Sequence, residues 1–582
     1  MDNKKVLLSV KNLNVKFRVR GRILTAIRGI SLDIYENESI AIVGESGSGK
    51  SVFTKTFAGM LDQNGFIPEG EIMFNDDELS DIYVNIGQTG KSLIGIIERR
   101  LNEYSKLENG SGTWKKILDL ESEKRAKETL TDKEDEEFNN RIKELKFKST
   151  ECYNKKQTLD PKKQKDLIRS AEKEIADYEE QIKAVEKERD ELIRSHKNDV
   201  SNDAEYKKKF DSEMNELRAQ YNKQIAKEIG EKKIKRNKLL AKEIYLSVGR
   251  YKYSTRLKAI REMLKISREA MKMGADLDTE AGKLSVFADG MFVSYIDETA
   301  DKLHGFCHLN LAKMSYPGDW SQVRGKRIAT VFQDPMTSLN PIITIGKQIT
   351  SIILKHQDCT EAEARSRALT LMKQVGIPNA EKRFDDYPFQ YSGGMRQRIV
   401  IAIALSCQPK ILICDEPTTA LDVTIQAQIL KLLKDLQKEY NYTIVFITHD
   451  LGVVANIADR VAVLYAGQLI ELGSVEDVFY DPRHPYTWAL LSSLPQLAEK
   501  GDKLYSITGT PPSLYNKITG DAFAPRNPYC MKIDTIAEPP MFKVNETHYA
   551  KTWLLDPRAP KMEKPELIGD IHGKILRTYH LA

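Results

Sequence analysis

The chain has 582 residues, of which 41% are hydrophobic and 30% charged, and its formal net charge is +5. This length accommodates several domains, and the near balance of 89 basic and 84 acidic residues gives no electrostatic indication of a nucleic-acid partner. No apolar run approaches the roughly 18 to 20 residues that span a bilayer, and we expect no signal peptide. The six scattered cysteines argue against a disulfide framework or a zinc knuckle.

A phosphate-binding loop follows the first predicted strands. The segment ISLDIYENESIAIVG predicts strands and runs into GESGSGKS, a G-x-x-x-x-G-K-S pattern before a predicted helix. The glycines let backbone N–H groups close around phosphate oxygens at the start of this helix. Lys50 is expected to reach the β- and γ-phosphates, and Ser51 to ligate Mg²⁺. The predicted nucleotide contacts of the loop are Gly44, Glu45, Ser46, Gly47, Ser48, Gly49, Lys50 and Ser51.

A second group of motifs lies in the C-terminal half. IATVFQDP places Gln333 just after a predicted strand, and SGGMR at 392–396 opens an apolar helix whose free N–H groups could hold a phosphate. ILICDE predicts a buried strand that ends in Asp415 and Glu416, at the edge where open α/β sheets bind ligands. We expect Asp415 to hold Mg²⁺ through water and Glu416 to polarise the attacking water. IVFITHD brings His449 to the same edge.

These motifs, in this order, resemble those of the ATP-binding cassette (ABC) ATPases over about residues 5–75 and 310–490. The resemblance implies a P-loop α/β domain with a helical subdomain, ATP and Mg²⁺ as cofactors, and head-to-tail pairing of two cassettes. Ser392, Gly393 and Gly394 would then complete the ATP site of the partner cassette. The implied motifs are Walker A at 44–51, a Q-loop whose Gln333 is catalytic and metal-binding, the signature at 392–396, Walker B at 411–416, a D-loop at 420–422 with nucleotide-contacting Asp422, catalytic His449 in the H-loop, and Phe17 under the adenine ring.

Shorter strings indicate a subfamily. HPYTWALLSSLP and ITGTPPSL look like the tail of oligopeptide and dipeptide permease ATPases, and QDPMTSLNP and YSGGMRQR agree with an OppD-type subunit. The resemblance implies an ATP-hydrolysing subunit of an oligopeptide importer, peripheral to the cytoplasmic face of the plasma membrane. Its implied partners are an OppF-like second ATPase, two OppB/OppC-like permeases and an OppA-like extracellular peptide-binding lipoprotein, with no nucleic acid.

A long charged segment separates the two groups of motifs. Apolar residues at 3-4 spacing over 168–192 and again over 210–221, with a polar stretch between them, predict two helices folded back as an antiparallel coiled-coil hairpin. A single solvated helix is the alternative. A partner-binding arm, a membrane-surface contact and a tolerated expansion all remain open as roles. The predicted divisions are the first part of the ABC domain at 1–78, a helical insertion at 79–309, the second part of the ABC domain at 310–490, and a C-terminal extension at 491–582.

The position of this insertion leaves a second class of ATPase open. Chromosome-maintenance ATPases also place coiled coil between the two halves of a cassette. Their arms are much longer than the segment predicted here, and the HPYT string of this chain is of permease type. DNA-stimulated ATPase activity without a membrane partner would favour that alternative.

The tail departs from its family at one point. Many OppD-type tails resemble a pattern with four cysteines, whose positions here hold Asp521, Asn527, Asp534 and Thr552, while Cys530 falls at a non-ligand position. Iron–sulfur clusters need several thiolates, so we expect no cluster and a tail held by packing and hydrogen bonds. A harder cation such as Mg²⁺ or Ca²⁺ on these oxygen and amide groups is the alternative.

Overall fold

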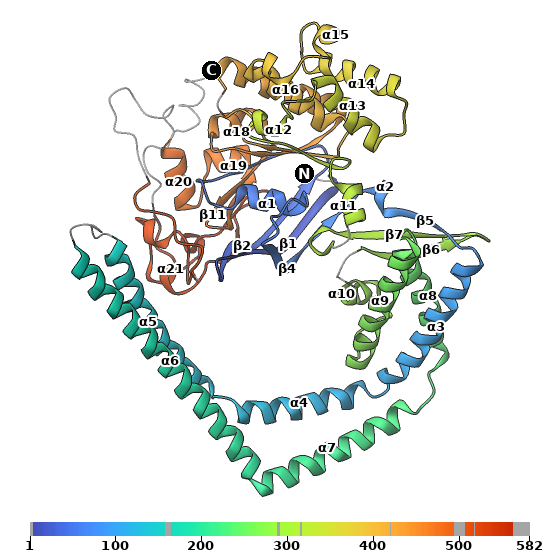
Figure 1. Ribbon diagram of the computed structural model, residues 1–582, viewed down its shortest axis with the longest axis vertical. Helices are drawn as coiled ribbons and strands as arrows, with labels where there is room; N and C mark the ends of the chain where they lie inside the picture. The colour runs from blue at the N-terminus through green and yellow to red at the C-terminus, as the bar shows by residue number, and fades with distance from the viewer. Residues whose placement is uncertain are drawn as a thin grey trace. The chain divides into compact units, whose positions relative to one another are not determined.

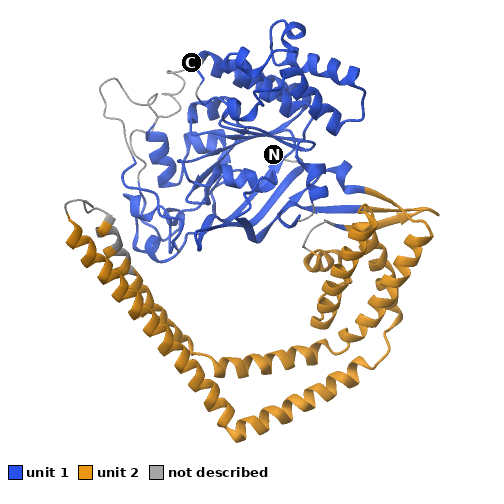
Figure 2. Cartoon of the chain, in the orientation of Figure 1, with its two compact units in different colours: residues 1–81, 288–292, 306–582 blue, residues 82–287, 293–305 orange. Residues whose placement is uncertain are grey.

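The computed structural model, drawn in Figure 1, forms two compact units, which Figure 2 shows in different colours. Unit 1 comprises residues 1–81, 288–292 and 306–582, and unit 2 comprises residues 82–287 and 293–305. Unit 2 is thus drawn from within the stretch predicted as an insertion. The structure describes residues 4–157, 164–287, 291–314, 317–419, 421–493, 507–516 and 518–562.

The central sheet of unit 1 has the order β13-β14-β12-β11-β3-β10-β9-β8. Strands β11, β3, β10, β9 and β8 run parallel, so their carboxyl ends meet at one edge. They are short apolar runs because a parallel strand is covered on both faces. Their bounds are β3 Ser39–Val43, β8 Ile328–Val331, β9 Ile411–Asp415, β10 Thr443–Ile447 and β11 Arg460–Tyr465, with antiparallel β12 Gln468–Ser474, β13 Phe542–Lys543 and β14 Tyr549–Ala550.

Helices cover this sheet, and α13, α14, α15 and α16 form a helical subdomain beside it (Figure 1). Buried residues of α13, α14 and α16, such as Ile349, Ala368 and Val400, share one apolar core with Val331 of β8 and Leu412 of β9. The loops after β8 and β9 are therefore seated on a packed base. The helices are α1 Lys50–Phe57, α2 Asp77–Ser80, α11 Pro317–Val323, α12 Pro335–Ser338, α13 Ile345–His356, α14 Glu361–Gln374, α15 Ala380–Arg383, α16 Gly393–Leu405, α17 Val423–Tyr440, α18 Leu451–Ile457, α19 Val475–Tyr480, α20 Pro485–Ser492 and α21 Lys532–Ile536.

An antiparallel sheet adjoins this core within unit 1. Strand β1 (Val6–Val19) pairs with β2 (Arg22–Tyr35) on one side and with β4 (Gly65–Phe74) on the other. Leu8 and Val10 are buried, and beyond a shift in the pairing register so are Leu13 and Val15.

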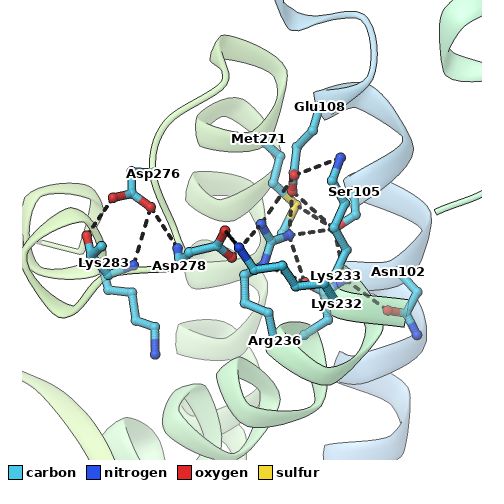
Figure 3. Close-up of polar contacts among 12 residues, drawn as sticks. Asn102, Ser105, Glu108, Lys232, Lys233, Arg236, Met271, Asp276, Asp278 and Lys283 are labelled. Atoms are coloured by element: carbon cyan, nitrogen blue, oxygen red, sulfur yellow. Dashed lines mark hydrogen bonds and ion pairs between the residues drawn. The ribbon is translucent and has the colours of Figure 1, made fainter. Parts of the chain in front are cut away.

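The base of unit 2 packs α3 against α8 and α9, with β5, β6 and α10 alongside (Figure 1). Its core includes a polar cluster, drawn in Figure 3, in which Arg236 of α8 donates to Glu108 and Ser105 of α3. Asn237 of α8 donates a hydrogen bond to Asn102 of α3 at 2.9 Å. The bounds are α3 Gln88–Glu108, α8 Glu231–Val248, α9 Tyr253–Met273, α10 Glu280–Val286, β5 Asp81–Asn85, β6 Met291–Glu298 and β7 Lys302–Asn310.

The longest helices of unit 2 pair differently from the predicted hairpin. Residues 168–192 are helical as expected, but α6 continues through the polar stretch to Asn202 because that stretch has no glycine or proline. Val185 of α6 packs with Phe138 and Ile142 of α5, whereas α7 packs against α4 around Ile117 and Met214. The predicted pairing of 168–192 with 210–221 is therefore wrong, and so is the single solvated helix. The bounds are α4 Ser111–Glu128, α5 Asp132–Gln157, α6 Lys165–Asn202 and α7 Ala204–Ile225.

No helix among the described residues combines the length and the apolar character that a bilayer span requires.

Candidate nucleotide-binding site

The phosphate-binding loop connects β3 to α1 and depends on glycine geometry. Gly44, Gly47 and Gly49 have φ of 151°, 79° and 102°, which side chains rarely tolerate. A Cβ at Gly44 would lie 2.2 Å from the carbonyl oxygen of Leu464, whereas one at Gly47 would meet nothing within 4 Å. Gly44 therefore permits a close approach to β11, and Gly47 lies on the open side of the loop.

Lys50 lies inside this loop at the start of α1. Its ammonium donates to the carbonyl oxygens of Gly44 at 2.7 Å and Glu45 at 3.0 Å. The side chain is buried, and burial lowers the pKa of Lys50 while the nearby carboxylates of Glu416 and Asp415 oppose this. A buried ammonium that donates only to carbonyl oxygens retains a strong attraction for anionic phosphate.

Ser51 and Asp415, both predicted to ligate the metal, place two oxygen groups together. Ser51 Oγ donates to Asp415 Oδ1 at 3.1 Å. Burial raises the pKa of Asp415, and the hydrogen bond from Ser51 opposes that change. Hydroxyl and carboxylate oxygens are the ligands that Mg²⁺ prefers, so this pair fits the ion. Ser48 Oγ, buried in the same loop, has no hydrogen-bond partner among the residues that the structure describes, and it fits a phosphate oxygen.

Glu416 lies directly after β9 and receives hydrogen bonds from three other segments. Gln333 Nε2 donates to its Oε2 at 2.9 Å, Thr419 Oγ1 donates to the same atom at 3.1 Å, and His449 Nδ1 lies 3.1 Å from Oε1. The Glu416 N–H donates to the carbonyl oxygen of Ile447 on β10, which fixes the backbone at a φ of 46°. The structure thus brings together the three residues predicted as catalytic.

Two family models match the sequence around this site. One, described as "ABC transporter", matches residues 27–160 and 293–419, and another, described as "Oligopeptide/dipeptide transporter, C-terminal region", matches residues 470–533. A *Streptococcus pneumoniae* protein named "Oligopeptide transport ATP-binding protein AmiE" is 66% identical over 266 residues, 46% of this chain and 75% of that protein. The chain belongs to the ABC transporter family.

Further relatives carry similar names. "Oligopeptide transport ATP-binding protein OppD" of *Bacillus subtilis* is 59% identical over 262 residues, 45% of this chain and 73% of that protein. A *Mycoplasma pneumoniae* protein of the same name is 41% identical over 319 residues, 48% of this chain and 74% of that protein. The family predicted from the motifs is thereby confirmed, and the chromosome-maintenance alternative is not favoured.

The signature residues of this cassette occupy a helix start. Ser392 is the N-cap of α16, and its side chain accepts the N–H of Met395 at 3.4 Å. A Cβ at Gly394 would lie 2.7 Å from Cγ2 of Ile425 on α17, so the glycine permits close packing of the two helices. A Cβ at Gly393 would have only Leu421 near it, at 3.8 Å. No hydrogen bond in the described part of the chain joins these residues to Lys50.

Asp422 and Phe17, also predicted to contact nucleotide, have structural partners. The Asp422 carboxylate caps α17 by accepting the N–H of Ile425 at 2.9 Å. Phe17 is half-buried on β1, and a Cβ at Gly65 would lie 2.8 Å from its ring. These contacts neither require nor exclude the predicted roles, which stay predictions.

Sequence reasoning missed several groups that touch this site. Thr419, in the string DEPTT, binds Glu416, and its position three residues beyond that carboxylate could have drawn attention to it. Tyr486 and Arg526 of the C-terminal region contact Glu45, and no spacing in the sequence connects them to the loop.

Proposed function

We propose that the chain is the ATP-hydrolysing subunit of an ABC importer that takes up oligopeptides. The observation that carries this proposal is the convergence of Gln333 and His449 on the Glu416 carboxylate, beside Lys50 and Ser51, in a chain whose relatives are named oligopeptide transport ATP-binding proteins. A carboxylate held in this way is arranged to accept a proton from water.

The residues of the site divide into binding and proton-transfer roles. Backbone N–H groups of the loop and Lys50 hold the phosphates, and Ser51, Asp415 and Gln333 supply the ligands for Mg²⁺. When bound, the ion neutralises charge on the phosphate oxygens. Glu416 takes the proton of the attacking water, and His449 keeps its carboxylate oriented.

A second cassette completes each ATP site in this proposal. Ser392, Gly393 and Gly394 at the start of α16 have N–H groups and a helix dipole suited to a phosphate. They would act on the nucleotide held by an OppF-like partner, with Asp422 at the same junction and Phe17 under the adenine of the chain's own nucleotide.

An apolar surface near the Q-loop is suited to a membrane permease. Ile342 is 80% exposed, Phe389 72% and Met336 58%. The segments that carry them are joined, because Ile345 N–H donates to the carbonyl oxygen of Asp386 at 2.9 Å and Arg396 contacts the sulfur of Met336. Large apolar side chains gathered on a surface are typical of protein contacts. We assign OppB/OppC-like permeases to this surface. In this proposal the chain lies on the cytoplasmic face of the membrane, and an OppA-like lipoprotein delivers peptide from outside.

The insertion and the tail complete the proposal. The helix pairs α5–α6 and α4–α7 act as a coiled-coil arm of the importer, supported by their apolar contact residues. The tail holds no iron–sulfur cluster. All four positions that would carry cysteine accept a neighbouring N–H, namely Asp521 from Phe523, Asn527 from Tyr529, Asp534 from Met531 and Thr552 from Leu554.

Co-purification in mild detergent and an ATPase assay test the function. The tagged chain is expected to bring down polytopic permease subunits, and the complex to hydrolyse ATP faster when a peptide-binding lipoprotein and oligopeptides are added. ATPase activity that DNA stimulates, with no membrane protein recovered, would overturn the proposal. Anaerobic purification with iron measurement tests the tail, where stoichiometric iron would contradict the expected absence of a cluster.

A further inference from the structure

Glu45, the second residue of the phosphate-binding loop, is held through all of its polar groups. Its N–H donates to the hydroxyl of Tyr486 at 2.8 Å, and its carbonyl oxygen accepts from Lys50 at 3.0 Å and from the N–H of Ser48 at 3.2 Å. Its carboxylate receives two hydrogen bonds from Arg526, at 2.7 and 3.0 Å. Tyr486 and Arg526 both lie in the region that follows the last long strand of the sheet, β12.

Arg526 is itself fixed on the side away from the loop. Its side chain is 5% exposed. Nε donates to the carbonyl oxygen of Thr508 at 3.0 Å, and Nη1 donates to the hydroxyl of Tyr465 at 3.1 Å. The hydrogen bonds to Glu45 raise the pKa of Arg526 above its ordinary value, so the guanidinium stays charged. A two-pronged pair whose guanidinium is buried fixes orientation as well as distance.

Aromatic packing makes the support of this pair rigid. The rings of Tyr465, Tyr486 and Phe523 lie in mutual contact, with centroids 4.6, 5.3 and 5.4 Å apart. All three side chains are buried and belong to one apolar core that also contains Val43, the last residue of β3. The strand before the loop and the tail beside it therefore share a single packed body.

We propose that the C-terminal extension sets the nucleotide affinity of the cassette by holding the phosphate-binding loop through Arg526. The inference rests on the proposed function, since it assumes that the loop binds ATP. Lys50 must leave the carbonyl oxygens of Gly44 and Glu45 to reach a phosphate, and the loop then loses its internal cation. Arg526 remains on the Glu45 carboxylate during this movement and keeps the following N–H groups converged. It is a positioning residue, because it acts on the nucleotide through Glu45.

Nucleotide binding by the full-length chain tests this role. Arg526→Met and Glu45→Gln are each expected to raise the Kd for MgATP, read with a fluorescent ATP analogue, about 10- to 100-fold, the cost of a slightly misplaced binding group. The KM should rise with the Kd while kcat changes little. Arg526→Lys should recover part of the affinity, since an ammonium keeps the charge but not the fork. The double variant should be no weaker than either single variant, because both remove one interaction.

Arg558→Met is the matched control. Arg558 lies in the same extension and forms a similar pair with Asp556, but its side chain is 86% exposed, so wild-type affinity is expected.

Wild-type Kd in both Arg526→Met and Glu45→Gln would overturn the inference, as would additive losses in the double variant. Should Arg526→Met fail to fold, Arg526→Lys takes its place, since it keeps the buried charge, and wild-type Kd in both Arg526→Lys and Glu45→Gln would overturn the inference. If the wild-type chain bound no nucleotide, the proposed function would be contradicted instead. Failure of the inference and failure of the proposed function therefore give different results.

Discussion

Ser51 Oγ and Asp415 Oδ1 lie 3.1 Å apart across a sequence separation of 364 residues. The first turn of α1 and the end of β9 thus form one oxygen-lined corner. Glu416 is the next residue along the chain, yet its carboxylate is bound by Gln333, Thr419 and His449 rather than by Ser51. In the proposed mechanism Ser51 and Asp415 ligate the metal and Glu416 transfers the proton, while Gln333, a proposed metal ligand, also binds Glu416. A substitution at Glu416 alone therefore tests proton transfer with Ser51 and Asp415 in place.

Glu416→Gln is expected to keep ATP binding and to lose turnover. The amide cannot accept the proton of the attacking water, while Ser51 and Asp415 stay in place for Mg²⁺. Loss of a positioned general base costs roughly 10² to 10⁴ in rate. Two measurements on the assembled transporter check the prediction: the nucleotide Kd checks that binding is kept, and single-turnover hydrolysis checks that turnover is lost. Glu476→Gln, on the exposed start of α19, is the control, and wild-type turnover in Glu416→Gln would remove the residue from the mechanism.

The insertion should be separable if it is cut at the right residues. The structure places Glu78 in an ion pair with Arg327, and Leu309 in register with Phe74 of β4. Replacing 82–305 with a short Gly/Ser linker keeps both contacts, whereas replacing 79–309 removes Leu309 and cuts α2 directly after Glu78.

We therefore expect the shorter deletion to give a folded, ATP-binding cassette with a higher melting temperature than the longer one. Thermal unfolding with and without MgATP compares them. An insoluble product from the shorter deletion would mean that unit 2 contributes to the fold of the cassette.

Arg236→Met should destabilise unit 2 strongly. The Arg236 and Glu108 side chains are 9% and 12% exposed, so the variant leaves a nearly buried carboxylate without its main partner (Figure 3). Breaking such a pair costs about 3 to 5 kcal/mol. Hydrogen exchange of α3 and α8 in the full chain measures the effect. Lys238→Met, an exposed change on the same helix, should leave the exchange unaltered, and equal protection in the two variants would contradict the prediction.

The tail carries a carboxyl group whose titration affects stability. Burial, and then the nearby Asp534, raise the pKa of Asp521 to about 6. Its folded-state pKa exceeds the unfolded value near 3.9, so the native state binds more protons between these values and stability falls as pH rises through that window.

Asp521→Asn removes this penalty and can still accept the N–H of Phe523. The variant should be more stable than wild type by about 2 to 3 kcal/mol at pH 7.5 and equally stable at pH 3.5. Calorimetric melting of the two proteins across this range provides the comparison. A constant difference between them at all pH values would show that the carboxyl group is not the cause.

The catalytic edge was predictable because each of its residues ends a recognisable apolar strand. Asp415, Glu416 and His449 follow β9 and β10, and adjacent parallel strands bring such residues to one edge. The helix partners in unit 2 were not predictable in the same way. The apolar spacing of α6 indicates that its apolar face packs against another helix, but it does not identify α5 or α7 as that helix.

The contact between Arg526 and Glu45 lies beyond sequence reasoning for another reason. The two residues are 481 positions apart, and each lies in a motif-like string that has its own local explanation. Only the packing of Tyr465, Tyr486 and Phe523 brings the strings together. The pattern of residues along the sequence carries no signal for this contact, whereas the buried guanidinium in the fold reveals it.

The nested pairing of helices in unit 2 has a consequence for synthesis on the ribosome. The inner pair α5–α6 is contiguous in sequence, and the outer pair α4–α7 closes around it. Pairs with short separations form early, and chains fold from the N-terminus as they emerge. Strand β3, by contrast, cannot pair with β10 until the ribosome has synthesised that strand, which begins at Thr443. Nascent chains should therefore display a protease-resistant insertion while the first half of the ATP-binding sheet is still unpaired.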